Sequence, residues 1–351
     1  MSGSTSQLYS VGGHSSPAID AQPSHSISAQ PSHAVTTTPS TFLNDVLKGL
    51  SSPQKSLSSK YFYDETGDRL FQRIMECDDY YLTRCEMEIF REHSAELAQP
   101  LNIHSGAFDL IELGAGDGTK TRHLLDYLHH QVADFRYLPV DISGHILDVL
   151  SQNLATTLPG VDVEPQQGDY FDALASICQT SERRKVLLFL GSNIGNMTVE
   201  ECSTFCQRLA SMMSPGDMLI TGFDLKKDPR TVLRAYDDSD GITREFNLNL
   251  LRRINEELQA DFDLTGFEHY QTYDPGSGAC RSYLISQREQ TVTIGGQRIL
   301  FLRHEPLFME VSRKFSRRDI GDLATESGFS QVAEVCDRKG WFMNAIWKRN
   351  A

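Results

Sequence analysis

The stretch DLIELGAGDGTKTR, residues 109–122, decides the fold of this chain of 351 residues. An apolar run ends in an acid, Glu112, and three glycines follow at positions 114, 116 and 118, after which a helical pattern begins. Glycine lets the backbone turn sharply and approach a ligand to a distance that a Cβ would block. A strand, a glycine loop and a helix in this order predict the first unit of a nucleotide-binding α/β sheet.

The spacing of the glycines bears on the kind of cofactor. It is GxGxG, whereas dinucleotide binding is typical of GxGxxG. A second carboxylate, Asp141, closes the next apolar run, FRYLPVD, about 20 residues beyond the loop, which suits a ribose diol. We therefore expect S-adenosylmethionine (SAM) rather than NAD, bound by Gly114, Gly116 and Asp141. A glycine-rich turn in an ordinary α/β domain is the alternative that the loop alone leaves open.

The rest of the chain supports a parallel sheet. Apolar runs expected to be strands alternate with helical patterns, which implies helices on both faces of the sheet. The strands are expected at 108–113, 135–141, 161–167, 185–190 and 217–223, and the helices at 119–130, 144–155, 170–178 and 198–213. A last helix at 317–327 and strands at 331–337 and 341–347 complete the order of a class I SAM-dependent methyltransferase sheet, which is Rossmann-like and has its last strand reversed.

Two segments fall outside this alternation. Residues 1–40 are rich in Ser, Thr, Pro and Gly and contain the repeat AQPSHSIS/AQPSHAVT, so we expect a disordered tail. Residues 225–315 contain helical and then β-like runs and are interpreted as an inserted, smaller, β-rich substrate subdomain. The SAM-binding domain is then expected at 41–224 plus 316–351, with helices at its N-terminus.

Composition narrows the class of partner. A formal net charge of −14 and a pI near 5.2 disfavour nucleic acid and anionic membrane and favour a small-molecule substrate. Seven scattered cysteines without a CxxC pair indicate neither a disulfide framework nor a metal site. No run approaches the roughly 18 apolar residues of a membrane span, and no signal pattern is present. We expect a cytoplasmic protein and favour a monomer.

In an open α/β sheet, ligands bind at the carboxyl ends of the strands. Lys120 follows the first expected strand, Asp169 and Tyr170 the third, and the segment from Gly191 to Asn196 the fourth. The paired amides of that last segment can donate and accept hydrogen bonds, which indicates a binding role. Methyl transfer requires only that the two reactants be held in line, and the sequence has no Ser-His-Asp order, HExxH or P-loop that would favour hydrolysis or phosphoryl transfer.

Several separated blocks resemble the bacterial histidine-specific Nα-methyltransferases, which convert L-histidine to hercynine in ergothioneine biosynthesis. The resemblance runs from about residue 42 to the C-terminus. FLGSNIGN and the tyrosine-rich block are particular to this family, whereas many methyltransferases share the glycine loop. The blocks are KYFYDETGDRLFQRIMECDDYYLTRCE (60–86), ELGAGDGTKTR (112–122), FLGSNIGN (189–196), LRAYDD (233–238), FNLNLLRRINEEL with DFDLTGFEH (246–269) and EVSRKF (310–315).

The resemblance implies roles for individual residues. It implies a SAM site made by Gly114, Lys120, Asp141, Asp169 and Tyr170. It places the amino-acid part of the substrate against Tyr80, Asn196 and Tyr236, beside Gly191, and the imidazole ring against Glu310 and Ser312. Such a carboxylate and hydroxyl can bond the two nitrogens of an imidazole. Tyr63 and Phe71 match the lining of the family's pocket, and cation–π contacts of roughly 0.5–2 kcal/mol suit three successive methylations of one nitrogen.

One departure and three alternatives remain. Actinobacterial members of the family carry methionine where this chain has Ser282, which leaves the acceptor less certain than the reaction. The acceptor could instead be another aromatic amino acid such as tryptophan, but a buried Glu310 facing an indole would lack a partner. A SAM-binding regulatory module without turnover would be expected to lack the substrate-side residues, which are present. The glycine spacing disfavours an NAD-dependent oxidoreductase.

Overall fold

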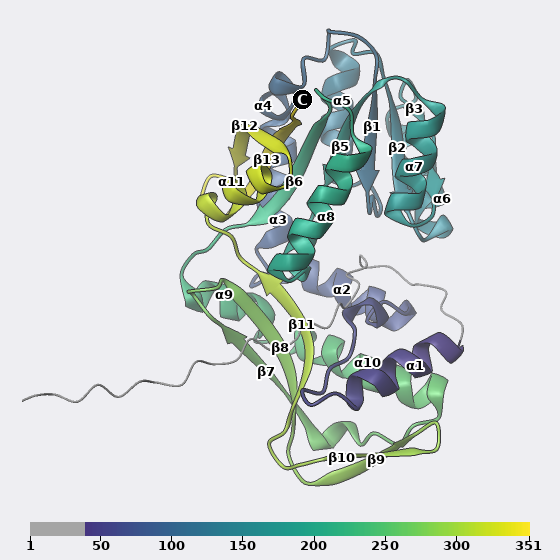
Figure 1. Cartoon of the computed structure of the whole chain (residues 1–351), viewed down its shortest axis with the longest axis vertical. Helices are drawn as coiled ribbons and strands as arrows, with labels where there is room; N and C mark the ends of the chain where they lie inside the picture. The colour runs from purple at the N-terminus through teal and green to yellow at the C-terminus, as the bar shows by residue number, and fades with distance from the viewer. Residues whose placement is uncertain (1–38) are drawn as a thin grey trace, which may run out of the picture.

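The structure is a computed structural model that describes residues 39–351. Residues 1–38 of the expected tail, with its repeat, lie outside the described residues, whereas the last two residues, Pro39 and Ser40, already belong to a helix. Its main sheet has the order β12-β13-β6-β5-β1-β2-β3, with β4 also paired to β2 (Figure 1). The strands are β1 Phe108–Leu113, β2 Phe135–Asp141, β3 Asp162–Val163, β4 Gln166–Gln167, β5 Arg184–Phe189, β6 Met218–Asp224, β12 Phe329–Cys336 and β13 Phe342–Arg349.

The pairing within this sheet confirms the expected fold class. Strands β1, β2, β5 and β6 run parallel, and β13 enters antiparallel beside β6 as the reversed last strand. One expected strand is different, because residues 161–167 form two short strands, β3 and β4, instead of one. Pro165 lies between them and has no N–H to donate to β2, so the ladder is interrupted there.

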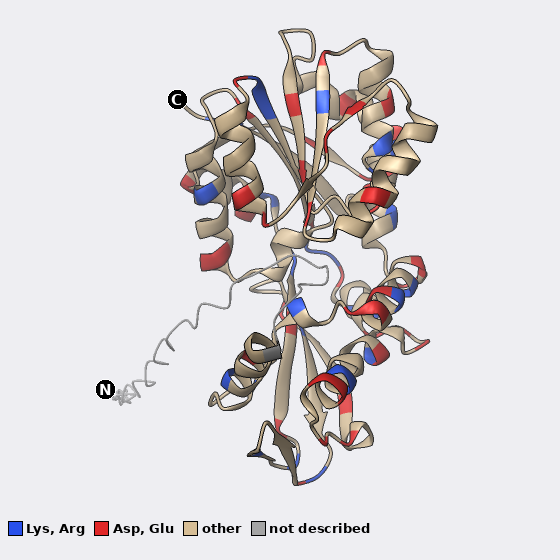
Figure 2. Cartoon of the chain, turned by 90° about the vertical axis from the view of Figure 1, so that its right-hand side faces the viewer, with Lys and Arg blue, Asp and Glu red and all other residues tan. Residues whose placement is uncertain are grey.

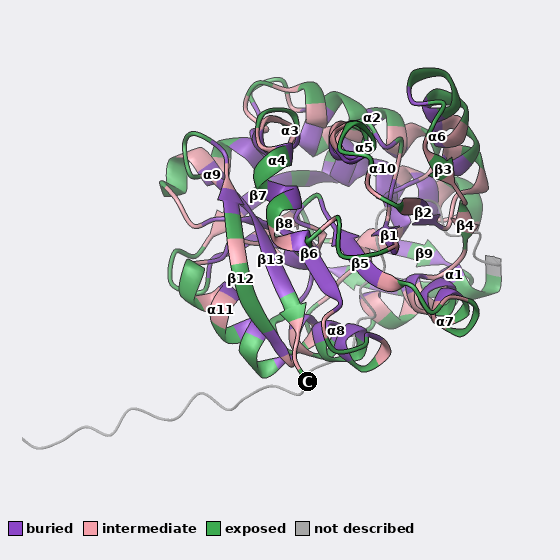
Figure 3. Ribbon diagram, turned by 90° about the horizontal axis from the view of Figure 1, so that it is seen from above, coloured by how far each residue is buried: buried purple, intermediate pink, exposed green. Residues whose placement is uncertain are grey.

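Helices cover both faces of the sheet because successive strand side chains point to opposite sides. Leu110 packs in the apolar cluster on one face and its neighbour Ile111 in the cluster on the other. Figure 3 shows the central strands buried, whereas the helices keep exposed outer faces. The first face is covered by α3 Leu82–Glu92, α4 Ser94–Ala98, η2 Gln99–Leu101, α5 Arg122–His130 and α6 Gly144–Thr157, and the second by α7 Tyr170–Thr180, α8 Val199–Met212 and α11 Arg317–Glu326.

A second, smaller part, which contains several β-strands, lies below the sheet in Figure 1. It contains a three-stranded antiparallel sheet of order β11-β8-β7 and a separate hairpin of β9 and β10. Its elements are α9 Pro229–Tyr236, α10 Ile242–Leu258, η4 Leu264–Gly266, β7 Phe267–Tyr273, β8 Ala279–Ser286, β9 Gln290–Ile294, β10 Gln297–Phe301 and β11 Pro306–Arg313.

The N-terminal helices pack differently from the sequence-based division. Helices α1 (Pro39–Leu50) and α2 (Glu65–Glu76), with the turn η1 (Ser59–Tyr61) between them, share an apolar cluster with residues 242–309, not with the main sheet. The ring centroids of Phe42 and Tyr61 lie 4.3 Å apart, and those of Phe62 and Phe246 of α10 lie 4.8 Å apart. The chain therefore enters the smaller part first and reaches the main sheet only at α3.

Acidic and basic residues are interspersed along the helices of both parts in the view of Figure 2. None of the helices within residues 39–351 combines the length and apolar character needed to cross a membrane.

Candidate active site

The glycine loop after β1 adopts the conformation that its sequence predicts. Gly114, Gly116 and Gly118 have φ angles of +74°, +56° and +68°, which side chains rarely tolerate. A Cβ at position 114 would collide with the hydroxyl of Tyr170, whereas a Cβ at position 116 would meet nothing within 4 Å. Tyr170 therefore packs directly against Gly114, whereas the space beside Gly116 is free for a ligand.

Polar groups around this loop fit a nucleoside cofactor. Asp141 ends β2, and its carboxylate accepts hydrogen bonds from the N–H groups of Gly116 at 3.3 Å and Ser143 at 3.0 Å. Asp169 caps α7 by accepting from the N–H of Phe171 at 2.9 Å. The buried hydroxyl of Tyr170 has no hydrogen-bond partner among the described residues, so a ligand atom beside it would gain one. These features suit the polar adenosyl group of SAM.

The other carboxylate near the loop, Glu112, has a structural role. It is buried, accepts from the hydroxyl of Thr121 at 2.7 Å and pairs with the hydroxyl of Tyr137. Burial raises the pKa of Glu112 to about 7, and the two hydroxyl groups oppose that rise. Since Thr121 directly precedes α5, Glu112 anchors the far end of the glycine loop to β1.

Glu86 of α3 is a site residue that the sequence reasoning missed. It is 1% exposed, forms an ion pair with Lys120 of the glycine loop, and accepts from the N–H of Gly191 at 2.9 Å. It therefore joins the loop after β1 to the loop after β5. The signal was an acid at a core-facing helix position, since Leu82 and Phe90, four residues to either side, are both buried.

We predict that Glu86→Gln lowers the free energy of unfolding by about 1.5–3 kcal/mol, because it leaves Lys120 without its partner and weakens the bond from Gly191. Urea denaturation measures the change. The matched control is Glu88→Gln on the same helix, whose partner Arg338 is exposed on the surface, and it should cost less than about 1 kcal/mol. Equal losses in the two variants would show that Glu86 makes no special link between the loops.

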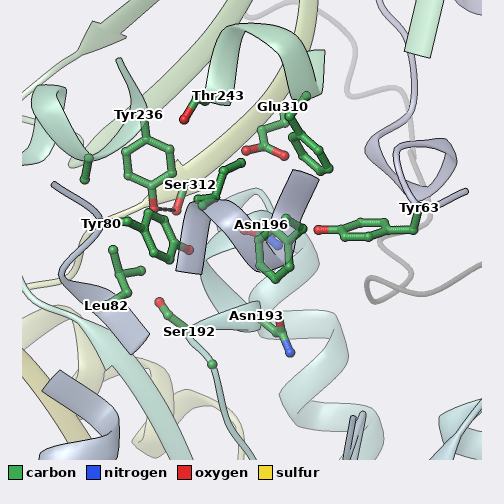
Figure 4. A pocket seen from close by; sticks show the side chains of 15 residues that line it. Tyr63, Tyr80, Leu82, Ser192, Asn193, Asn196, Tyr236, Thr243, Glu310 and Ser312 are labelled. Carbon is green, nitrogen blue, oxygen red and sulfur yellow. Dashed lines mark hydrogen bonds between the residues drawn. The ribbon is translucent and has the colours of Figure 1, made fainter. Parts of the chain in front are cut away.

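A pocket lies between the carboxyl edge of the main sheet and the smaller part of the chain (Figure 4). It is lined by segments far apart in the sequence, namely the N-terminal helices, the turn η3 (Asn193–Asn196) after β5, α9, α10 and β11. Eight of the nine substrate residues expected from the sequence line it, and these are Tyr63, Phe71, Tyr80, Gly191, Asn196, Tyr236, Glu310 and Ser312.

Ser282 is the expected residue that does not line the pocket. It lies opposite Glu310 in the register of β8 and β11, but its hydroxyl donates to the side chain of Gln271 at 2.7 Å within the sheet. The pocket has other lining residues that the sequence reasoning did not single out. Two of them, Thr243 and Phe246, lie one turn apart on α10, and the others are Ile74, Leu82, Ser192, Asn193 and Ala235.

One end of the pocket carries the carboxylate of Glu310. This side chain has no hydrogen-bond partner among residues 39–351, although it points into the pocket in Figure 4. Burial raises the pKa of Glu310 to about 7, and the nearby ammonium group of Lys314 opposes that rise. An unpaired carboxylate in an enclosed site favours a ligand that supplies an N–H donor.

Two hydroxyl groups lie together in the pocket, that of Ser312, two residues after Glu310 on β11, and that of Tyr236 of α9. The hydroxyls of Tyr236 and Ser312 lie 2.7 Å apart, and the ring of Tyr80 contacts that of Tyr236 edge-on with centroids 5.9 Å apart. Burial raises the pKa values of Tyr80 and Tyr236 well above the usual value for tyrosine, so both hydroxyls stay protonated and can donate.

The aromatic wall of the pocket is built from three rings. Tyr63 contacts Phe71 and Phe246 with centroids 5.7 Å apart in each case, and Phe71 lies 6.0 Å from Phe246. The electron-rich faces of such rings attract a cationic, poorly hydrated group such as a methylated ammonium.

Comparison with known proteins places this geometry in context. The family model described as "Histidine-specific methyltransferase, SAM-dependent" matches residues 42–349. The chain is 37% identical over 300 residues to the histidine N-alpha-methyltransferase of Mycobacterium tuberculosis, covering 85% of this chain and 92% of that protein. It is 36% identical, with the same coverage, to the histidine N-alpha-methyltransferase of Mycolicibacterium smegmatis.

A more distant relative is the ergothioneine biosynthesis protein 1 of Neurospora crassa, which is 31% identical over 289 residues, covering 80% of this chain and 32% of that protein. The family match spans both the main sheet and the smaller part, so it includes the glycine loop and the pocket alike. On this evidence the chain belongs to the family of SAM-dependent, histidine-specific methyltransferases.

Proposed function

We propose that this protein transfers methyl groups from SAM to the α-amino group of L-histidine and forms hercynine, as in ergothioneine biosynthesis. The observation that carries this proposal is the unpaired carboxylate of Glu310 inside a pocket that otherwise offers hydroxyl and amide groups. Imidazole supplies the N–H that this carboxylate lacks. A purely apolar side chain on the substrate would leave it buried and unpaired, at a cost of about 1–3 kcal/mol.

SAM supplies an electrophilic methyl group on a sulfonium. In our proposal the loop of Gly114 and Gly116 lets the backbone approach it, and Asp141 binds its ribose diol. Lys120, Asp169 and Tyr170 complete the cofactor site. Glu86 holds the cofactor loop and the loop of Gly191 in one arrangement, so the two reactants are brought to near-attack distance.

The substrate is held by its polar ends. In our proposal Glu310 and Ser312 bind the imidazole ring, while Tyr80, Asn196 and Tyr236 bind the amino-acid part. The wall of Tyr63, Phe71 and Phe246 stabilises the ammonium group, which grows with each methylation and becomes a fixed cation at the third. Each of the first two transfers leaves a protonated amine, which must release its proton to solvent before its lone pair can attack the next methyl group. The third transfer gives a quaternary ammonium, which has no proton to lose and keeps a fixed charge.

Some of the broader expectations also stay proposals. We propose that the substrate-side part consists of residues 39–76 with 225–315, because α1 and α2 share their core with α10. The remaining described residues then form the SAM-binding part. Location in the cytoplasm and a monomeric state are kept as predictions from composition.

Mass spectrometry tests the reaction directly. The purified protein is incubated with SAM and a mixture of the twenty amino acids, and products heavier by one, two or three methyl groups are sought. Selective appearance of trimethylated histidine supports the proposal. Methylation of tryptophan in preference to histidine, or no turnover of SAM, would contradict it.

We also predict a pH dependence that originates in Glu310. Because the pKa of Glu310 in the protein is about 7, the ionised form that accepts an imidazole N–H is present above pH 7 and is lost as the pH falls through 7. We divide kcat/KM of the parent by kcat/KM of Glu310→Gln at each pH, and this quotient should fall about tenfold between pH 8 and pH 6. Taking the ratio cancels the titration of histidine itself. A ratio that is constant with pH would contradict the role of Glu310.

A further inference from the structure

Behind the pocket lies a buried cluster of charges that the proposed function has not used. Asp224, at the end of β6, and Lys314, just after β11, are both 0% exposed, and their charged atoms lie 2.8 Å apart. Lys227 is a second, largely buried ammonium group and forms an ion pair with the other oxygen of Asp224. The two ammonium groups share the single carboxylate of Asp224, and Lys314 also acts on the carboxylate of Glu310 in the pocket. A cation buried in this way needs several partners to offset the cost of its desolvation.

The contacts of Lys314 connect this cluster to the pocket. Its ammonium donates to the hydroxyl of Tyr236 at 2.7 Å and to that of Ser312 at 2.8 Å, besides its contact with Asp224. These three partners use all three N–H donors of an ammonium group. Since Lys314 is fully buried, it has neither the exposure nor a free donor to contact a ligand itself.

Lys314 determines which way the two hydroxyls can donate. Each oxygen accepts from the ammonium, so each hydroxyl must turn its own proton away from Lys314. One proton lies between Tyr236 and Ser312, whose oxygens are 2.7 Å apart, and the other is left to point into the pocket. A hydroxyl that accepts from a cation is also a stronger donor, because bonds in a chain polarise one another.

We propose that Lys314 is a positioning residue that turns the hydroxyl of Tyr236 toward the carboxylate of the substrate, while the oxygen of Ser312 stays available to the imidazole ring. This inference rests on the proposed function, because it assigns the two ends of the same pocket. The ionised carboxylate of Glu310 repels a second carboxylate and accepts an N–H, whereas the hydroxyl of Tyr236, which accepts from the buried ammonium of Lys314, attracts a carboxylate. An amino acid with a basic side chain thereby binds in one orientation.

Lys227 provides a matched control within the same cluster. Its ammonium donates to Tyr81, to the backbone oxygen of Leu225 and to Asp224, and none of its contacts reaches Tyr236 or Ser312. Replacing either lysine removes one positive charge and leaves Asp224 paired with the other lysine. Lys314→Met and Lys227→Met therefore change the charge of the cluster equally, but only the first removes the donor behind the pocket.

The test is calorimetric binding of L-histidine and of histamine, which lacks the carboxylate, to the full chain with S-adenosylhomocysteine present to prevent turnover. Lys314→Met should weaken histidine binding about tenfold or more, the effect of a lost hydrogen bond to a charged group, while histamine changes by less than about threefold. Lys227→Met should leave histidine binding within about threefold of the parent. In a Tyr236→Phe background, Lys314→Met should add little further loss.

Thermal melting verifies that each variant is folded, and Lys314→Leu, which likewise has no donor and no charge, replaces Lys314→Met if the latter does not fold. Unchanged histidine binding in the folded variant would overturn the inference. Equal losses for histidine and histamine would do the same, since they indicate a structural role only. A parent protein that binds no histidine would instead contradict the proposed function.

Discussion

Asp141→Ala is expected to weaken the binding of SAM by roughly 30- to 150-fold, which corresponds to a loss of about 2–3 kcal/mol. The reason is that Asp141 ends β2 at the carboxyl edge of the sheet, where a carboxylate can accept both hydroxyls of a ribose in charge-assisted bonds. Its orientation is set before any ligand arrives, because the N–H groups of Gly116 and Ser143 already donate to its two oxygens. Isothermal titration of SAM into the purified variant measures the effect.

The same two backbone contacts create a second way to lose affinity, since removing the side chain also releases the glycine loop. Asp141→Asn separates these effects because the amide keeps an oxygen for one backbone N–H but has no charge. If charge-assisted binding of the ribose dominates, both variants should lose most of their affinity. If Asp141→Asn binds SAM as tightly as the parent, the carboxylate serves the loop and the ribose assignment fails.

The sheet could be predicted because its sequence signals are local. Apolar runs of strand length, the glycines at 114, 116 and 118, and helical spacing between them each depend on a few neighbouring residues. The one strand that differed, at 161–167, contains Pro165, and a proline within a strand is itself a local signal of interruption. Errors in this region were thus limited to details of single elements.

The packing of the N-terminal helices could not be predicted in the same way. An amphipathic pattern shows that α1 has an apolar face, but it does not show which apolar surface will cover it. Here Phe42 and Val46 pack with residues of α10 and β9, about 200 positions away in the sequence. Chain order suggested a domain with the glycine loop, and long-range packing decided otherwise.

The pocket was predicted mainly through resemblance, and the contacts behind it were not. Tyr236 and Ser312 were expected to bind different parts of the substrate, yet their hydroxyls bond each other. The helical spacing signals that Glu86 is buried, but it does not identify Lys120 as its partner, and nothing in the sequence pairs Lys314 with Asp224, because each ion pair joins residues from separate segments. Such partners become visible only when the fold places their side chains together.

Glu310→Ala is expected to reduce kcat/KM for histidine by about 10- to 150-fold, the effect of losing one hydrogen bond to a charged group worth roughly 1.5–3 kcal/mol. The carboxylate has no hydrogen-bond partner among the described residues, so its removal breaks no hydrogen bond within the protein. Folding and SAM binding should therefore be nearly unchanged. This separates the variant from changes at Tyr236 or Ser312, which would also disturb Lys314.

Tryptophan provides the comparison that decides specificity. In the parent, an indole would leave a buried carboxylate without a full set of partners, which a polar site rejects strongly. Glu310→Ala removes that penalty and enlarges the pocket, so kcat/KM for tryptophan should change little or rise while that for histidine falls. The ratio of the two values should consequently shift by at least about tenfold. An equal fall for both amino acids would mean that Glu310 maintains the shape of the pocket, and recognition of histidine would then have to depend on other groups.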